Sequence, residues 1–390
     1  MAESLFFELL RDFQDTTRVK DLISGLSDPD WNRFFEILTN TALFPYCCDQ
    51  LLKNKSYPIP LYCRDRIKNM YLLNLKRQGY LELELNEIWD EFGLKGIRAI
   101  PLKGPFLAHF LYSDLGLRRA SADLDILVKQ DEFSLAEEIL KKRGYCPLVS
   151  EPFYSFRIQR DRQILYSRKD NNGECLKIEL HLELRPQGTR KLSEDFFQDT
   201  MLLKAGERQI EFPSLENLLI YLSLLAWTTT ELPELRYFFE LHTLIKRFSS
   251  QINWKKLQEK ISIQYKAVVF FALVVCRDLF NSFIPDSFLR AIRPNLFKCS
   301  LLGLWMNDRQ LLLNTYRLRR YYFFTFWHYF VSSYLYSNGF FDGLRTSLKK
   351  VFLPRREIMF YYDKADDNPP LRTYLKRITR PFFHWRSVVN

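Results

Sequence analysis

The stretch from Ala99 to Val128, AIPLKGPFLAHFLYSDLGLRRASADLDILV, contains the signals that decide how this chain folds. A short apolar run, predicted as a strand over residues 96–100, leads to a Lys-Gly pair, and the proline that follows suits the first turn of a helix over residues 105–113. After a glycine break, the sequence DLDILV predicts a second strand over residues 123–128. This alternation of strand and helix predicts an α/β unit.

Two aspartates, Asp123 and Asp125, stand two residues apart at the start of that second predicted strand. Residues two apart in an extended chain point to the same side, so the two carboxylates should share one face. Neighbouring carboxylates repel one another unless a cation lies between them. Their hard oxygen ligands suit Mg²⁺, which also takes ligands from substrate phosphates. The pair therefore predicts a metal site.

Lys103 and Gly104 stand directly before the predicted helix that begins at Pro105. At such a place, backbone N–H groups and the positive end of the helix dipole face an anion. The lysine adds a positive charge beside the turn. This segment therefore predicts a phosphate site next to the metal site.

A third candidate carboxylate comes from residues 176–184, LKIELHLEL. Apolar residues alternate there with Lys177, Glu179, His181 and Glu183, which predicts a strand with one apolar and one polar face. If the polar face lies beside the two aspartates, Glu179 or Glu183 completes a site of three carboxylates. The alternative is an ordinary solvated strand face. We expect His181 to be a structural hydrogen-bonding group.

The rest of the chain is predicted to be mostly helical around this core, which gives an α+β fold. The N-terminal region should contain a long amphipathic helix over residues 64–92, softly interrupted at Gly79. Within the core we expect a helix over residues 131–142 and β-like runs over 153–158, 163–167 and 176–184. The expected division is an N-terminal helical region at 1–92, an α+β core at 93–212, a helical domain at 213–310 and a basic, aromatic-rich segment at 311–390.

The positive charge is concentrated near the C-terminus. The 390 residues carry a net charge of +11, and from Arg317 onward there are 14 Lys and Arg against 5 Asp and Glu. This segment predicts contact with nucleic acid or an anionic membrane, and a solvated surface is the alternative. Residues 321–341 contain no Asp, Glu, Lys or Arg, but their polar and aromatic side chains suit a membrane interface better than a span.

The cysteines and histidines argue against disulfide bonds and against a zinc site. The seven cysteines include no CxxC pair, and the N-terminus lacks an export signal, so we expect reduced thiols in a cytoplasmic protein, with peripheral membrane contact as an option. The five histidines show no zinc spacing.

These motifs resemble the uncharacterised nucleotidyltransferase family of the DNA polymerase β-like superfamily. The resemblance rests on a Pro-Leu-Lys-Gly turn, a Leu-Arg-Arg approach, the Asp-x-Asp strand and a later acidic strand, and it extends over roughly residues 30 to 250. The segments that carry it are Pro101–Gly104, Leu117–Arg119, Asp123–Val128 and Ile178–His181, with helical landmarks at Trp31, Asn69–Leu75 and Leu235–Ile245.

The resemblance implies a nucleotidyltransferase-type mixed sheet and an Mg²⁺-dependent enzyme that moves NMP from an NTP to an acceptor hydroxyl. It implies that Asp123 and Asp125 bind two Mg²⁺ ions and that Glu179 is the third metal-binding carboxylate, on the side of the attacking hydroxyl. Lys103 and Gly104 would hold the β- and γ-phosphates, and Arg119 would neutralise triphosphate charge.

Two other functions remain open at this point. A toxin-type nucleotidyltransferase has a similar layout, although Pro105 replaces the second glycine of its Lys-Gly-Gly turn. A catalytically silent module that binds nucleotide, membrane or nucleic acid is the second alternative. The sequence does not specify the acceptor, which could be a peptide, a sugar, another small molecule or tRNA.

Overall fold

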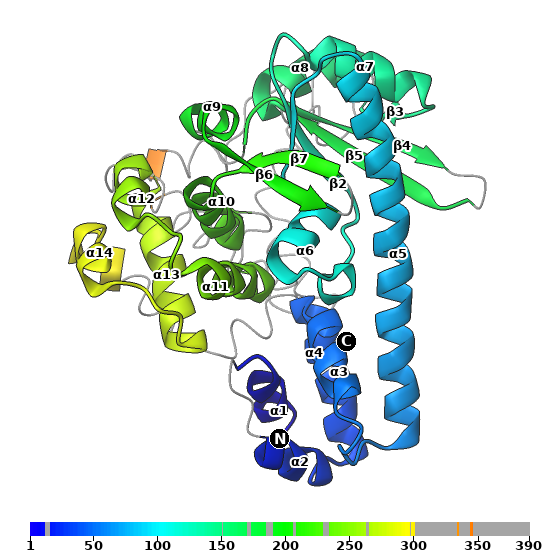
Figure 1. Cartoon of the computed structure of the whole chain (residues 1–390), viewed down its shortest axis with the longest axis vertical. Coiled ribbons are helices and arrows are strands. Elements are labelled where there is room, and N and C mark those ends of the chain that lie inside the picture. The colour runs from blue at the N-terminus through cyan, green and yellow to red at the C-terminus, as the bar shows by residue number, and fades with distance from the viewer. Residues whose placement is uncertain are drawn as a thin grey trace, which may run out of the picture. The chain divides into compact units, whose positions relative to one another are not determined.

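Five strands form the sheet on which the site is built, in the order β1-β2-β5-β4-β3 (Figure 1). The pairing of β2 with β5 is parallel, and the other neighbours are antiparallel. A mixed sheet surrounded by helices confirms the predicted α+β class. The strands are β1 (Ala99–Pro101), β2 (Leu124–Val128), β3 (Cys146–Pro147), β4 (Gln163–Lys169) and β5 (Cys175–His181).

The sheet belongs to the first of two units, Met1–Leu218 and Leu219–Asn390. This is a computed structural model. It describes residues 1–11, 16–149, 151–169, 173–184, 190–205, 208–228, 234–262, 265–296, 298–300, 334 and 344–345. The finer division into four segments stays a prediction.

Alternation along the central strands gives the sheet two different faces. Ile126 on β2 and Ile178 on β5 belong to the apolar face and are fully buried. On the same face of β4, Tyr166 donates a hydrogen bond to Glu137 at 3.0 Å, and Arg168 contacts Glu84 at 2.6 Å. Glu137 lies on α7 (Phe133–Lys142) and Glu84 on α5 (Leu61–Leu94), so these helices cover the apolar face.

Helix α5 links the N-terminal helices to the sheet (Figure 1). Its 34 residues span about 50 Å, and it continues through Gly79, where the sequence predicted a soft interruption. Before it lies α3, which begins with a capping box between Ser27 and Asp30 and buries Trp31. The other N-terminal helices are α1 (Ala2–Leu9), α2 (Thr16–Ser24), α3 (Asp28–Thr41) and α4 (Phe44–Lys53).

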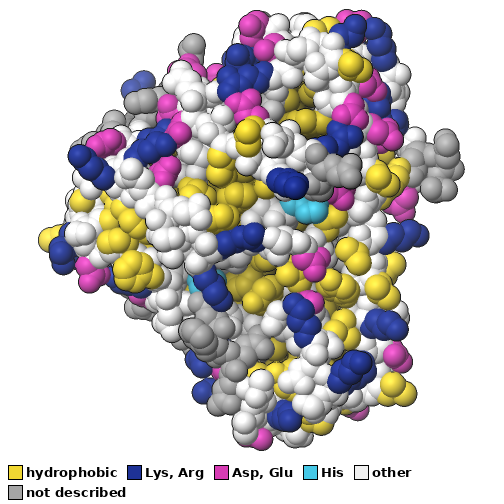
Figure 2. Space-filling model, in the orientation of Figure 1, with side chains coloured by type: hydrophobic (Ala, Val, Ile, Leu, Met, Phe, Trp, Pro, Cys, Tyr) yellow, Lys and Arg dark blue, Asp and Glu magenta, His cyan; other side chains and the backbone are white. Residues whose placement is uncertain are grey.

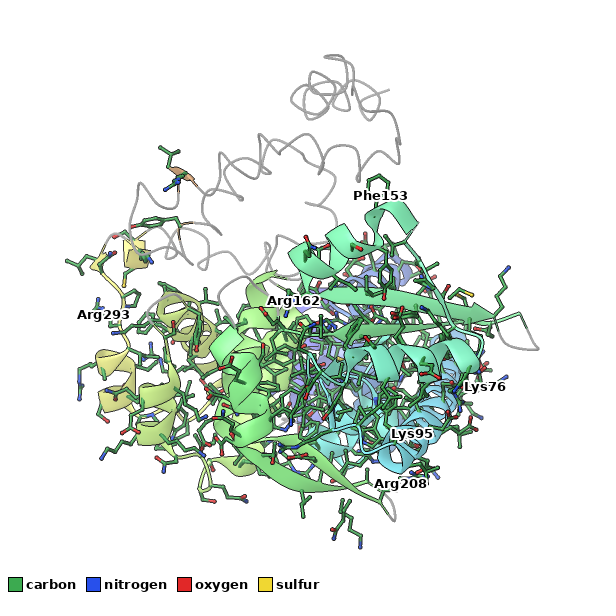
Figure 3. The ribbon with its side chains drawn as sticks, turned by 90° about the horizontal axis from the view of Figure 1, so that it is seen from above. Lys76, Lys95, Phe153, Arg162, Arg208 and Arg293 are labelled. Carbon is green, nitrogen blue, oxygen red and sulfur yellow. The ribbon has the colours of Figure 1, made fainter. Side chains whose placement is uncertain are left out.

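Two segments of the core differ from the prediction. Residues 153–158, expected as a strand, lie in helix α8 (Glu151–Asp161), which runs beside β4 with Phe153 near its N-terminal end (Figure 3). An ion pair between Arg157 and Asp161 at 2.9 Å, with helical i,i+4 spacing, supports α8. A hairpin of β6 (Thr200–Ala205) and β7 (Arg208–Pro213) was not predicted. The remaining core elements are α6 (Pro105–Tyr112), η1 (Leu115–Leu117) and α9 (Arg190–Gln198).

Helices form the described part of the second unit, as predicted for the chain after Pro213. Helices α11 and α13 pack through Phe239 and Phe280, whose ring centroids lie 5.6 Å apart. Two helices, α12 and α13, lie within residues 254–280. The elements are α10 (Leu215–Thr228, which begins in the first unit), α11 (Leu235–Phe248), α12 (Trp254–Lys260), α13 (Lys266–Phe280) and α14 (Asp286–Ala291).

The predicted basic segment at 311–390 lies outside the described residues, apart from residues 334, 344 and 345. Over the face drawn in Figure 2, Lys and Arg side chains are spread among acidic ones. A search of the described helices finds none with the length and apolar character needed to cross a bilayer.

Two amide side chains of α5 hold the loop that leads into β2. Asn74 Nδ2 donates to the carbonyl oxygens of Gly116 at 3.1 Å and Arg118 at 2.9 Å, and its Oδ1 accepts from the Ala120 N–H at 2.8 Å. Gln78 Nε2 also donates to the Arg118 carbonyl, at 3.0 Å. Both side chains are buried, so the backbone groups of this loop depend on them.

Replacing Asn74 by Ala should lower the free energy of unfolding by about 1–3 kcal/mol, because it leaves buried backbone groups without partners. Urea denaturation followed by circular dichroism measures the change. Asn69→Ala is the matched control, because Asn69 is exposed on the same helix and its loss should be nearly neutral. Equal losses from the two variants would contradict this role of Asn74.

Candidate active site

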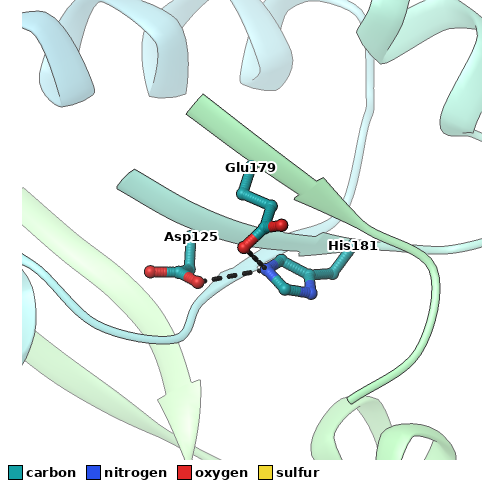
Figure 4. A group of neighbouring side chains, drawn as sticks. All are labelled: Asp125, Glu179 and His181. Atoms are coloured by element: carbon teal, nitrogen blue, oxygen red, sulfur yellow. Dashed lines mark hydrogen bonds and ion pairs between the residues drawn. The ribbon is translucent and has the colours of Figure 1, made fainter. Parts of the chain in front are cut away.

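The parallel pairing of β2 with β5 brings two of the predicted carboxylates together. In its register, Asp125 lies opposite Glu179, and Leu127 lies opposite His181. The polar face of the sheet thus presents Asp125, Glu179 and His181 side by side (Figure 4). One ligand atom from each of these three side chains lies within 4.8 Å of the others.

Asp125 has a fully buried side chain whose two oxygens differ in their surroundings. Oδ1 accepts hydrogen bonds from Lys103 Nζ at 2.9 Å and from His181 Nε2 at 3.1 Å. Oδ2 is buried and accepts none from the described residues. Burial alone would raise the pKa of Asp125, but Lys103 and His181 hold it well below its usual range. The carboxylate is therefore ionised.

Glu179 is held from two sides. Its Oε1 accepts a short hydrogen bond from Gln163 Nε2, and its Oε2 lies 3.5 Å from His181 Nε2. Burial raises the pKa of Glu179, but the hydrogen bond and charge of His181 outweigh burial and lower it. Burial lowers the pKa of His181, while Asp125 and Glu179 raise it to about 9. At neutral pH, His181 is thus a cation between two carboxylates.

Asp123 lies directly before β2 and is half-buried. Burial raises its pKa, and repulsion from Asp125 raises it further. Within the described part of the chain, the Asp123 carboxylate forms no hydrogen bond or ion pair. Repulsion from Asp125 thus acts on the Asp123 carboxylate, and a cation bound to both would relieve it.

Gly104 forms the predicted turn before α6. Its φ of +77° is a conformation that side chains disfavour, and an added Cβ would lie 3.3 Å from Leu124 Cδ2 at the start of β2. The turn therefore needs glycine and lies against the strand that carries Asp125. The first N–H groups of α6, at Phe106 and Leu107, have no partner within an α-helix and suit an anion.

The other predicted residues occupy different surroundings. Arg119 is exposed on the loop that Asn74 holds. Glu183, the alternative third carboxylate, lies beyond the end of β5 and pairs with Arg162 at 2.9 Å. Glu179 is thus the acidic residue of β5 that lies beside Asp125.

The part played by Gln163 was not predicted, and His181 was expected only to be a structural hydrogen-bonding group. Gln163 lies opposite His181 in the antiparallel pairing of β4 with β5. The hairpin register would have placed it on the polar face beside Glu179. No local pattern around Gln163 indicates this role, because it depends on the neighbouring strand.

The donor set fits a divalent cation with a preference for oxygen. Asp123 and Asp125 supply carboxylate oxygens, and the buried Oδ2 of Asp125 has no hydrogen bond from the described residues. A buried anionic oxygen without a partner is unfavourable unless a cation binds to it. The residues present therefore fit a Mg²⁺ ion.

Comparisons with known proteins place the chain in a family. Residues 27–281 match the family described as "Uncharacterised nucleotidyltransferase". No curated protein matches the chain. Among solved structures, the chain is similar to an antigenic nucleotidyltransferase-like protein from Paracoccidioides brasiliensis, with 13% identity and a TM-score of 0.35, over 52% of this chain and 88% of that one. Because the family match spans well over half of the 390 residues, the chain belongs to the uncharacterised nucleotidyltransferase family.

Proposed function

We propose that this protein is an Mg²⁺-dependent nucleotidyltransferase that transfers the NMP part of an NTP to an acceptor hydroxyl. The observation that carries the proposal is the parallel β2–β5 register, which sets Asp125 opposite Glu179. The glycine turn at Gly104 lies against β2, so a phosphate at the turn would lie close to the carboxylates. Membership of the family supports the same reaction class.

Each predicted site residue has a role in this proposal. Asp123 and Asp125 would hold Mg²⁺, which neutralises phosphate charge and makes the acceptor hydroxyl easier to deprotonate. Gly104 and the first N–H groups of α6 would bind the β- and γ-phosphates, with Lys103 beside them. Arg119, exposed on the loop before β2, would neutralise charge on the triphosphate.

The reaction requires alignment and neutralisation of charge more than covalent help from the protein. The acceptor oxygen forms a bond to the α-phosphorus, and the bond from that phosphorus to the bridging oxygen breaks, which releases pyrophosphate. The Glu179 carboxylate would accept the proton of the attacking hydroxyl. Gln163 and His181 hold the Glu179 carboxylate in place for this step.

Several details remain predictions from the sequence. Contact of the basic C-terminal segment with an anionic membrane or nucleic acid and a cytoplasmic location belong to this group. The toxin-type and catalytically silent alternatives are separated from the proposal by the experiments below.

Replacing Asp125 by Asn should lower transfer at least about a hundredfold, because the amide removes a metal-binding charge while keeping the side-chain shape. Purified protein is incubated with Mg²⁺, α-labelled NTPs and cell extract, and the labelled macromolecules are identified. Label on tRNA together with growth arrest on expression would support the toxin-type alternative.

Asp131→Asn is the matched control for that substitution, because Asp131 is exposed just beyond β2 and should be dispensable. Mg²⁺ with NTP should raise the melting temperature of the wild type and not that of Asp125→Asn. Absence of both transfer and thermal shift in the wild type would contradict the proposal. A thermal shift without transfer would favour the catalytically silent module.

Replacing Gly104 by Ala should weaken NTP binding about tenfold and destabilise the protein by about 1–3 kcal/mol, because its backbone conformation, with φ of +77° and ψ of −151°, is nearly restricted to glycine. Calorimetric titration with NTP and thermal melting measure the two effects. Gly79→Ala is the control, since a Cβ there meets nothing within 4 Å and alanine favours a helix. Unchanged NTP affinity in Gly104→Ala would show that the turn does not hold the phosphates.

A further inference from the structure

The oxygens of Asp125 and Glu179 that could bridge a shared metal ion already have partners on the protein. Asp125 Oδ1 accepts from Lys103 Nζ at 2.9 Å and His181 Nε2 at 3.1 Å. Glu179 Oε2 lies 3.5 Å from the same Nε2 atom. The edge of the imidazole therefore lies between the two carboxylates, as the two dashed lines in Figure 4 show.

The remaining oxygens of these two residues differ from one another. Glu179 Oε1 accepts from Gln163 Nε2, so both oxygens of Glu179 have a partner. Asp125 Oδ2 is buried and has no hydrogen bond from the described residues, and it points away from His181 (Figure 4). A cation can therefore bind Asp125 Oδ2 without breaking a hydrogen bond or ion pair within the protein.

We propose that the site takes one divalent cation, through Asp123 and the Oδ2 atom of Asp125, and that Lys103 and His181 occupy the place of a second. The inference rests on the proposed function and differs from the two ions that the family resemblance implies. In this arrangement Glu179 does not bind metal and acts only on the acceptor hydroxyl.

The positive charge of Lys103 favours one bound divalent cation over two. The Lys103 ammonium contacts Asp125 directly, and its side chain is only 16% exposed, so solvent screens it weakly. A second divalent ion between Asp125 and Glu179 would lie a few ångströms from that ammonium and would have to displace the imidazole edge. Like charges at such a distance repel strongly in a poorly solvated site.

The number of bound ions is a direct test. Mn²⁺ prefers the same oxygen ligands as Mg²⁺, and the electron paramagnetic resonance signal of free Mn²⁺ reports how much is bound. The full-length protein is titrated with Mn²⁺ in the presence of a saturating, non-hydrolysable α,β-methylene NTP analogue. The same titration of the analogue alone gives the Mn²⁺ bound to free nucleotide, which is subtracted. We expect one Mn²⁺ per chain, and two ions per chain would overturn the inference while leaving the proposed function intact.

Two variants test the parts assigned to the Lys103 ammonium and to the His181 side chain. Lys103→Met should tighten Mn²⁺ binding by about tenfold or more in the absence of nucleotide, because it removes a neighbouring positive charge. The Lys103→Met/His181→Asn double variant should bind a second Mn²⁺. Lys142→Met is the control for net charge, since Lys142 pairs with Glu138 on the exposed side of α7 and its loss should leave Mn²⁺ affinity unchanged.

The number of Mn²⁺ ions bound per wild-type chain is measured without any variant. This number therefore decides between one ion and two even if a variant misfolds. Unchanged Mn²⁺ affinity in folded Lys103→Met would overturn the role assigned to Lys103. Absence of any Mn²⁺ binding to the wild type would contradict the proposed function together with this inference.

Discussion

A buried carboxylate on a central strand is the constraint on which the rest of the site depends. All five residues of β2 are buried, and Asp125 is the charged one among them. An isolated charge in such a place is strongly unfavourable, so it must be compensated by partners from neighbouring elements. Lys103 from the glycine turn and His181 from β5 supply that compensation. Because Asp125 must be neutralised, the Lys103–Gly104 turn, β2 and β5 all have to meet at its carboxylate.

The surrounding fold keeps this arrangement in register. Parallel pairing of β2 with β5 fixes Glu179 opposite Asp125, and the hairpin of β4 with β5 brings Gln163 to the same face. From the N-terminal side, α5 fixes the backbone of the loop before β2 through Asn74. Helix α5 and strands β2, β4 and β5, which lie far apart in the sequence, thus position the polar side chains of the site. Preorganised polar groups of this kind are what phosphoryl-group transfer requires.

Local pattern was enough to predict several parts of the site. Gly104 before a proline indicated a helix-initiating turn, and alternation in residues 176–184 placed Glu179 on a polar strand face. The same alternation could not choose between Glu179 and Glu183, because both lie on that face. The choice depends on where β5 ends and on Arg162, which pairs with Glu183. The partner of Lys103 likewise depends on tertiary structure.

The predictions that were wrong or missing have similar physical reasons. The aromatic and β-branched residues at 153–158 favour a strand locally, yet this segment folds as α8. There Tyr154 reaches Glu137 on α7, a contact that local propensity does not include. The hairpin of β6 and β7 was missed because the sequence of β6, TMLLKA, has no clear alternation. Tertiary contacts decide both segments.

The proposed reaction requires Asp125 to bind a metal ion beside a bound triphosphate. A crystal structure with Mn²⁺ and a non-hydrolysable NTP analogue, analysed by anomalous scattering from manganese, tests it most directly. We expect an anomalous peak within bonding distance of Asp125 Oδ2 and Asp123, with the triphosphate at the Gly104 turn. An analogue bound elsewhere, or an Asp125 carboxylate that contacts only Lys103 and His181 while the analogue is bound, would contradict it.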